Sequence, residues 1–542
     1  MVSDNSTAAG IESGRDPKWW TLTAVCTGVF MLLLDITIVN VALPDIQSQL
    51  DASLSDLQWV IDAYALSLAA LLLTAGSLAD LYGRRRVFVI GLVVFTIGSI
   101  ACGAAQDIFF LQISRAFQGI GGAAMFATAL ALLASAFHGK DRGTAFGIFG
   151  ATTGVAVAIG PVLGGVLTSG LSWRWIFFVN IPICLVALAV SLTRVVESKD
   201  PNAGRPDWFG FVSFSLALGA LVYGLIEAGQ GSWTDQKVVA SLVASAVLLV
   251  TFVVSQLLQS KPMFDLSLLR KPTFTGGLIA AFGVSASIFS LLTFLVIYVQ
   301  NVLGYSAVET GIRFLYLSVA SFFAAAIAGR LTEHVPVKWL IAPGFLILGV
   351  GLLLLHGFRE DSAWTHLIPG LIVTGIGIGM INPPLASTAV GVVPVARAGM
   401  ASGVNSTFRQ VGIATGIAAL GSIFSQQVAS AVRPDLSGKV PAQALDGLTA
   451  ALSGGQVQAA AQGAQQAATQ AQGPAVGQQA YDLVHQVGTS GVVDALNHIT
   501  LIAAVIAFTS GVLSLLLIRQ KDFVVRGRSP GVEEVDAAEQ VG

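Results

Sequence analysis

The sequence predicts an all-α, polytopic membrane protein with fourteen transmembrane helices. Only 11% of the residues are charged and 54% are hydrophobic, whereas an average soluble domain carries about 25% charged residues. The apolar residues gather in fourteen runs, each close to the roughly 20 residues that a helix needs to cross a bilayer. The loops between these runs are alternately rich and poor in Lys and Arg, as expected of a chain that crosses a membrane repeatedly.

Charged or turn-rich segments separate the fourteen runs. The first run begins at Trp19 and no cleavage signature follows it, so we expect a retained helix. The expected spans lie near residues 19–43, 57–79, 87–105, 109–136, 143–169, 174–193, 208–228, 237–258, 273–300, 308–329, 338–357, 365–390, 399–425 and 496–518.

Basic residues set the expected orientation. An even number of spans puts both termini on one side, and 20 of the 28 Lys and Arg residues then lie on that side, five on the other and three within spans. Short cytoplasmic loops are enriched in these residues. We therefore expect a multi-pass protein of the plasma membrane whose N-terminal tail (1–18) and C-terminal tail (519–542) are both cytoplasmic.

Residues 426–495 interrupt this pattern. Of the 40 residues at 441–480, 23 are Ala or Gln, and no apolar run there is long enough to span. Because Ala and Gln are good helix formers, we expect a long extracytoplasmic loop with an amphipathic or frayed helical hairpin. Its role is either that of a solvated spacer or that of a contact for gating or for an adaptor protein.

Composition and motifs argue against other functional classes. The net charge of -2 gives no basic excess for nucleic acid, and the three cysteines lie in apolar runs without metal-ligand spacing. The sequence contains no GxxxxGK[ST] phosphate loop and no nucleophile–base constellation. We expect no enzyme, no metal site and no bound cofactor.

Ionisable side chains inside the spans are the main functional candidates, because each costs about 2.5–3.5 kcal/mol at the centre of a helix. They are Asp35, Asp62, Arg115, Glu227, Arg313 and Arg409. Asp35, Asp62 and Arg115 all fall in the outer half of the membrane. Desolvation disfavours a buried carboxylate, so Asp35 is expected to load and release a proton. Arg115 is either its permanent partner or a partner within the cycle.

Several of the remaining polar candidates have two readings. Asn40 is a polar neighbour near the outer end of the first span, and Asp62 is either a second proton site or a polar anchor. Glu227 and Arg313 lie nearer the outer surface and are expected at a cavity or gate, and Glu227 has an interfacial position as its alternative. Arg409 lies near mid-depth in a polar patch and either lines an inner cavity or snorkels to the inner surface.

Glycines in the fifth span predict a close helix contact. Gly154, Gly160 and Gly164 surround Pro161, and small residues four apart let helix backbones approach closely. Pro161 removes a backbone donor, which predicts a bend. We expect this helix to be a hinge or seal of the outer half, with ordinary close packing as the alternative.

The loop between the second and third spans predicts an intracellular latch made of Gly76, Asp80, Gly83 and Arg84. Asp80 stands near a helix C-terminus, where the helix dipole disfavours negative charge. It should therefore have a cationic or helix-N-terminal partner on another element. Gly83 permits a tight turn.

Four ordered stretches resemble the major facilitator superfamily, specifically its fourteen-helix drug:proton antiporter branch. The stretch Trp173–Pro182 is also typical of this branch. In the second half of the chain, Gly329–Glu333 is a degenerate copy of the loop between the second and third spans. The four are the loop Gly76–Arg86, the first-helix run Leu34–Pro44 with Asp35, the fourth-helix run Leu111–Gly122 with Arg115, Gln118 and Gly119, and the fifth-helix run Gly154–Gly165.

The resemblance implies two six-helix bundles, at 19–193 and 273–518, with two helices inserted at 194–272 and a substrate cavity between the bundles. It also implies a proton-coupled exporter of lipophilic or cationic small molecules such as drugs or antibiotics. We expect a functional monomer that works by alternating access and is driven by the proton motive force. The alternatives are a dedicated exporter of one endogenous metabolite, such as a self-made antibiotic, and a non-transporting receptor or assembly partner.

Overall fold

The fold is helical throughout the part of the chain that the computed structural model describes, and no strand occurs there. The described residues are 17–52, 54–137, 141–200, 207–230, 232–259, 262–332, 334–360 and 362–523. In lipid every backbone polar group must be paired internally, which is why long apolar runs fold as helices. Within the described ranges, twelve helices are long and apolar enough to cross a membrane, and a further apolar helix, Lys338–Leu354, is shorter.

Helices α1 to α7 form the first bundle around a core of buried Leu, Phe and Ala side chains. α6 and α7 together occupy the sixth expected span and are separated only at Val179. The helices are α1 (Pro17–Leu50), α2 (Leu54–Tyr82), α3 (Arg84–Gly103), α4 (Ile108–Ala136), α5 (Asp141–Gly170), α6 (Trp175–Phe178) and α7 (Asn180–Arg194).

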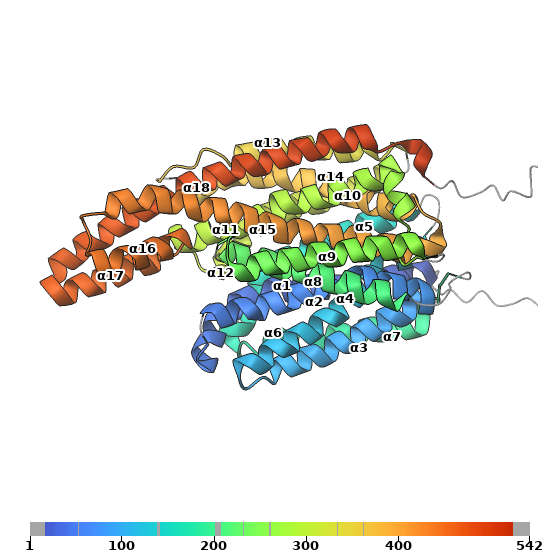
Figure 1. Cartoon of the computed structure of the whole chain (residues 1–542), viewed down its shortest axis with the longest axis horizontal. Coiled ribbons are helices and arrows are strands. Elements are labelled where there is room, and N and C mark those ends of the chain that lie inside the picture. The colour runs from blue at the N-terminus through green and yellow to red at the C-terminus, as the bar shows by residue number, and fades with distance from the viewer. Residues whose placement is uncertain are drawn as a thin grey trace, which may run out of the picture.

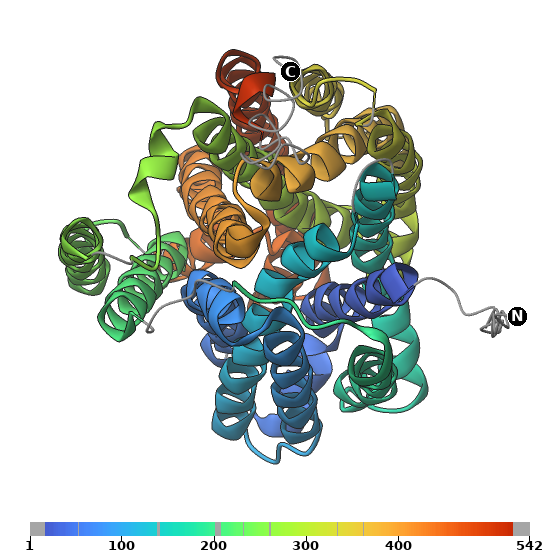
Figure 2. The same ribbon diagram turned by 90° about the vertical axis from the view of Figure 1, so that its right-hand side faces the viewer.

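Two helices, α8 (Trp208–Gln230) and α9 (Gln236–Leu258), pack against each other at the edge of the molecule, where Figure 2 shows them as a green pair. α9 exposes a row of valines, among them Val243, Val247 and Val250, each more than half exposed. A helix with such an apolar outer face suits contact with lipid.

The second bundle contains η1 to η6 and α10 to α18. Its first span is a continuous helical run in which two π-helical segments, η2 and η3, alternate with α10 and α11. The elements are η1 (Leu266–Arg270), α10 (Pro272–Val284), η2 (Ser285–Phe289), α11 (Ser290–Ile297), η3 (Tyr298–Val302), α12 (Ala307–Leu331), α13 (Lys338–Leu354), η4 (Trp364–His366), α14 (Leu367–Gly391), η5 (Val395–Arg397), α15 (Ala398–Leu436), α16 (Ala442–Ser453), α17 (Val457–Gln472), α18 (Pro474–Leu517) and η6 (Gln520–Asp522).

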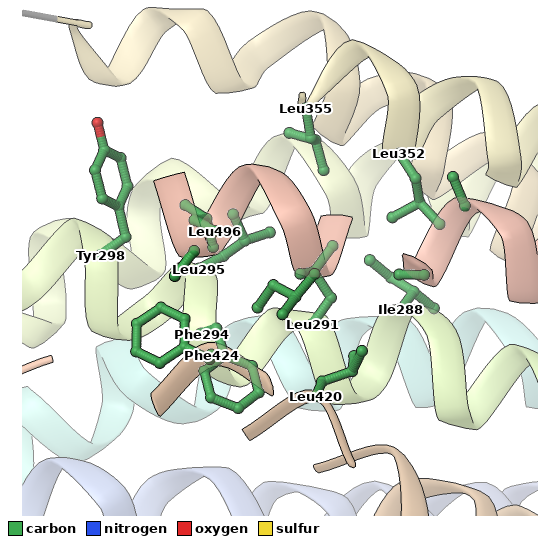
Figure 3. Packing of buried hydrophobic residues seen from close by; sticks show 14 of the residues in the cluster. Ile288, Leu291, Phe294, Leu295, Tyr298, Leu352, Leu355, Leu420, Phe424 and Leu496 are labelled. Carbon is green, nitrogen blue, oxygen red and sulfur yellow. The ribbon is translucent and has the colours of Figure 1, made fainter. Parts of the chain in front are cut away.

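The core of the second bundle joins α11, α13, α15 and α18. Figure 3 shows Leu291, Phe294, Leu420 and Leu496 converging from three of these helices. The rings of Phe294 and Phe424 lie 5.2 Å apart, between centroids. Large side chains thus fix the outer helices of this bundle, while glycines mediate the contacts between the two bundles.

Both ends of the described chain, Pro17 and Phe523, lie at the same end of the molecule (Figures 1 and 2). We call this the terminal end and the opposite one the distal end. Residues 1–16 and 524–542, which make up most of the two expected tails, lie outside the described residues.

The segment 426–495, called the distal extension below, was expected to be a long loop with an amphipathic or frayed helical hairpin, and the structure has helices there. It consists of the end of α15, the whole of α16 and α17 and the start of α18, and it projects beyond the bundle at the distal end (Figure 1). Its own core contains Leu436, Leu452, Val457 and Val484, all fully buried. The extension is therefore a packed helical unit and not a solvated spacer.

Leu452→Ala is expected to loosen the distal extension without unfolding the membrane bundle. Removing a fully buried Leu side chain costs about 2–5 kcal/mol. Limited proteolysis should therefore cut within 437–473 at least tenfold faster than in the wild type. Gln443→Ala, at an exposed position of the same helix, is the control and should change the rate little. Equal cutting rates for the two variants would contradict a packed extension.

Candidate proton-coupling site and interbundle latch

A fully buried polar network surrounds Asp35 inside the first bundle. The Arg115 guanidinium donates from Nη1 to Asp35 Oδ2 at 2.6 Å. Gln118 Nε2 and Asn180 Nδ2 donate to Asp35 Oδ1 at 3.0 and 2.7 Å. Ser99 Oγ accepts from both amides, at 2.7 and 3.3 Å. The carboxylate thus accepts from three side chains contributed by α4 and α7.

Arg115 makes two further hydrogen bonds and a cation–π contact besides its ion pair with Asp35. Its Nε donates to the Val60 carbonyl of α2 at 3.1 Å and its Nη1 to Gln118 Oε1 at 2.7 Å. The guanidinium also lies 4.3 Å from the centre of the Tyr64 ring, a favourable cation–π distance. Asp35 is 0% and Arg115 1% exposed, so this charge pair is sealed from water. A buried pair of this kind requires good geometry and further hydrogen bonds, and this one has both.

Gln118, Asn180 and Ser99 complete the network, although none of them was among the predicted site residues. Gln118 follows Arg115 by three positions and thus shares its helix face. Asn180 begins α7, within the stretch Trp173–Pro182. Ser99 on α3 carries no sequence signal, because a lone Ser in an apolar helix is common.

Asn180→Leu is expected to weaken transport about tenfold to a hundredfold. The change removes a 2.7 Å donor to a charged acceptor, and such a bond contributes roughly 1.5–3 kcal/mol. Gln479→Leu, on the exposed surface of α18, is the control. Transport by Asn180→Leu at the wild-type rate would count against the network.

The third residue of the predicted proton site, Asp62, lies on α2, and Asn40, predicted for the cavity or gate, lies on α1. Asp62 is half-buried, two positions after the Val60 carbonyl that Arg115 contacts. The side chain of Asn40 lies outside the described residues, as does that of Pro161.

Glycines of α5 bring this helix against both α1 and α12. A Cβ placed on Gly160 would overlap the Thr37 hydroxyl of α1, and one on Gly329 of α12 would lie 2.5 Å from the Gly147 Cα. At Gly154 an added Cβ would meet only ordinary contacts of 3.7 Å or more. α5 is one continuous helix through Pro161, and Gly164 is buried. α5 is therefore a contact surface between the two bundles.

Asp80 at the terminal end connects α2 to the start of α15. Its Oδ1 accepts from Arg84 Nη2 at 2.8 Å and from the Gly399 amide at 2.9 Å, and its Oδ2 accepts from the Met400 amide at 2.8 Å. Asp80 thus has both kinds of expected partner, a cation and a helix N-terminus on another element. The two orphan amides and the helix dipole favour the carboxylate here.

Arg84 and the nearby glycines tighten the same contact. Arg84 is 1% exposed, and its Nη2 also donates to the carbonyls of Val395 and Ala396, just before α15. Gly83 has φ +115, which only glycine adopts easily. A Cβ on Gly76 would overlap the Gly399 carbonyl, so α2 and α15 approach to backbone contact.

Glu197 supports the loop of the latch from within the first bundle, and it was not predicted. It follows α7, and its carboxylate accepts from the amides of Arg85 and Arg86 at 3.0 and 3.1 Å. It therefore caps the start of α3 and closes the turn at Gly83. A single Glu in a loop after a span gives no signal of this role in the sequence.

The last three candidates lie apart from the Asp35 network. Glu227 is half-buried near the distal end of α8. Arg313 on α12 lies over the Tyr305 ring at 3.5 Å and near the Trp364 ring at 5.0 Å, between the guanidinium carbon and the ring centroid. Arg409 on α15 is half-buried, and its Nη2 donates to Asn382 Oδ1 of α14 at 2.9 Å.

Residues 25–417 match the family model described as Major Facilitator Superfamily. The chain belongs to this superfamily. As a superfamily member with many apolar helices it is a multi-pass membrane transporter and not an enzyme. The human organic anion transporter MFSD10 (TETRAN) has the same fold, with a TM-score of 0.56 at 15% identity over 75% of this chain and 94% of that chain.

Several superfamily relatives have names that refer to drugs. The multidrug resistance protein Stp of Mycobacterium tuberculosis is 38% identical over 78% of each chain. The puromycin resistance protein pur8 of Streptomyces alboniger is 36% identical over 80% of this chain and 87% of its own. The tetracenomycin C resistance and export protein of Streptomyces glaucescens is 32% identical over 78% of each chain.

Proposed function

We propose that this superfamily member is a proton-driven efflux transporter that exports lipophilic small molecules, such as drugs or antibiotics, from the cytoplasm. The buried Asp35–Arg115 pair is the observation that carries the proposal. A charged pair inside a membrane is costly and marks proton relays and transport sites. The drug resistance and export functions in the relatives' names support the direction of transport and the class of substrate.

The proposed topology has fourteen spans in the plasma membrane, with α5 and α13 added to the twelve helices identified by length and composition. Both termini are cytoplasmic, as the bias in Lys and Arg supports. The terminal end then faces the cytoplasm, and the contacts of Asp80 and Arg84 close it. Along the chain, the inserted pair α8–α9 separates the two six-span bundles. The two bundles work together as one monomer.

In the proposed cycle, substrate enters from the cytoplasm when the latch opens and leaves at the distal end when it closes. Proton uptake by Asp35 then neutralises the carboxylate, weakens its 2.6 Å contact with Arg115 and allows the return. Release of the proton to the cytoplasm restores the pair. One charge crossing about 150 mV supplies roughly 3.5 kcal/mol, enough for a gradient of about several hundredfold of a neutral substrate.

A second candidate is a dedicated exporter of a single endogenous compound. It is favoured by the two Streptomyces relatives, each of which is named for one antibiotic. Growth protection of cells that express the chain, across a panel of antibiotics and dyes, separates the two. Protection against one compound supports the dedicated exporter.

The decisive experiment for the proposed function is substrate-driven proton movement in everted membrane vesicles. Addition of a transported drug to energised vesicles should release protons from the lumen in proportion to drug uptake. Absence of that movement for every drug against which the chain protects would contradict proton coupling.

A further inference from the structure

Arg409 is a cation in the second bundle without an acidic partner. Its hydrogen-bond acceptor, the Asn382 amide oxygen, carries no charge, and no ion pair to Arg409 occurs among the described residues. A guanidinium within a membrane span is costly and is usually paired or directed toward a water-filled cavity. Its retention without a counter-charge therefore calls for a ligand.

The neighbouring spans of the second bundle do not supply that counter-charge. The spans of the second bundle at 310–332, 338–354, 367–391 and 398–432 contain neither Asp nor Glu. In the first bundle, the buried carboxylates of Asp35 and Asp80 are already engaged by Arg115 and Arg84. No ion pair among the described residues therefore neutralises the charge of Arg409.

Arg409 also lies where the two bundles meet. Its partner Asn382 precedes Pro383, which lies 3.1 Å from the place of a Cβ on Gly150 of α5. One turn further along α14, Ala386 packs into the core of the first bundle. The Arg409–Asn382 contact is thus at the interface that alternating access opens and closes.

A strip of unsatisfied polar atoms continues from Arg409 along α15. Ser402 and Asn405 precede Arg409 by seven and four positions and share its helix face. Both are buried, at 0% and 2% exposure, and neither Ser402 Oγ nor Asn405 Oδ1 has a hydrogen-bond partner. Buried polar atoms are nearly always paired, so these oxygens are candidates to accept hydrogen bonds from hydroxyl or amide groups of a ligand when the interface opens.

We propose that Arg409, with Asn382, recognises an oxyanion on the substrate, namely a carboxylate or an ionised phenol on an otherwise lipophilic molecule. The guanidinium presents several N–H donors in a planar fork that matches such a group. This assignment rests on the proposed efflux function and narrows it, because the same positive site disfavours lipophilic cations. Export of an anion against an incoming proton also makes each cycle carry more charge than export of a neutral molecule.

Equilibrium binding to the purified full-length chain in nanodiscs tests the assignment. The probes are pyrenebutyrate, its methyl ester and tetraphenylphosphonium. The wild type should bind the acid about tenfold to a hundredfold more tightly than the ester, because a charge-assisted hydrogen bond is lost with the ester. Arg409→Gln should bring this ratio close to one while leaving the affinity for the ester unchanged, and Arg409→Lys should retain part of it.

Asn382→Leu provides a second variant in case Arg409→Gln does not fold, and Arg433→Gln on the distal extension is the control. Asn382→Leu should reduce the ratio, and Arg433→Gln should not. Equal binding of acid and ester by the wild type, or an unchanged ratio in both site variants, overturns the assignment. If one of these results is found while proton-linked efflux of other drugs persists, only this inference fails. Absence of proton-linked efflux for every compound removes the proposed function instead.

Discussion

Asp35→Asn is expected to abolish substrate-driven proton movement, with a fall of at least about a hundredfold in coupled exchange. Asn has nearly the shape of Asp, so the bonds from Gln118 and Asn180 retain their geometry. It carries no titrating proton, however, and with its oxygen toward Gln118 and Asn180 its NH2 group faces Arg115, so the 2.6 Å hydrogen bond from Arg115 is lost. The return step then no longer depends on the outer pH. The measurement is proton release from everted vesicles on drug addition.

The same variant should still fold and bind drug. Removing one partner of a buried ion pair costs about 3–5 kcal/mol, but Arg115 keeps its bonds to Gln118 and to the Val60 carbonyl. A monodisperse elution profile and drug affinity within about threefold of wild type would establish this. Asp435→Asn, at an exposed position of the distal extension, is the matched control. Unchanged proton exchange in a folded Asp35→Asn variant would remove Asp35 from the coupling mechanism.

The residues of this site that could be predicted from the sequence were the charged residues inside apolar runs. A carboxylate or guanidinium in an apolar run is costly, so Asp35 and Arg115 were both evident, and helix direction placed them at one depth. Asn180 and Ser99 cost far less in such a run, and their roles depend on how α7 and α3 pack. Only the assembled bundle brings them to Asp35.

The packing of the distal extension was not predicted, for a related reason. Low hydrophobicity at 441–480 correctly argued against a span, and the abundance of Ala and Gln correctly predicted helix. The tight packing was missed because it depends on a few well-spaced residues, such as Leu452 and Val457, that meet the continuations of α15 and α18. Hydropathy averaged over a window hides a pattern this sparse.

At the latch, the charge of Asp80 near a helix C-terminus was enough to predict that this residue has a partner, but not which one. The helix dipole required a partner for Asp80, and the structure gives it Arg84 and two amides of α15. The sequence could not identify which of the many helix starts supplies those amides. That choice depends on Gly76 and Gly399, which let two backbones from opposite bundles touch.

Arg84→Gln is expected to open the terminal end, whereas Arg86→Gln is not. Both variants remove one positive charge from the same loop. The Arg84 side chain is 1% exposed and lies 2.8 Å from Asp80, whereas the Arg86 side chain is 70% exposed and lies 3.8 Å from Glu197, a longer and weaker contact. Loss of Arg84 leaves Asp80 without its cation and frees the carbonyls of Val395 and Ala396. Breaking a buried pair costs about 3–5 kcal/mol, whereas an exposed pair contributes about 0–1 kcal/mol.

If the loss of Arg84 destabilises only the closed conformation, by about 3 kcal/mol, the equilibrium between closed and open states shifts roughly a hundredfold toward the open state. The labelling rate of a cysteine at position 77 reports this shift, because Ser77 is 6% exposed beside Gly76 in the closed interface. In a background that lacks Cys26, Cys102 and Cys184, a membrane-impermeant maleimide should label Ser77→Cys at least tenfold faster when Arg84→Gln is added. Arg86→Gln should leave the rate within about twofold. Equal rates in the two variants would mean that Arg84 supports the turn locally and does not hold the bundles together.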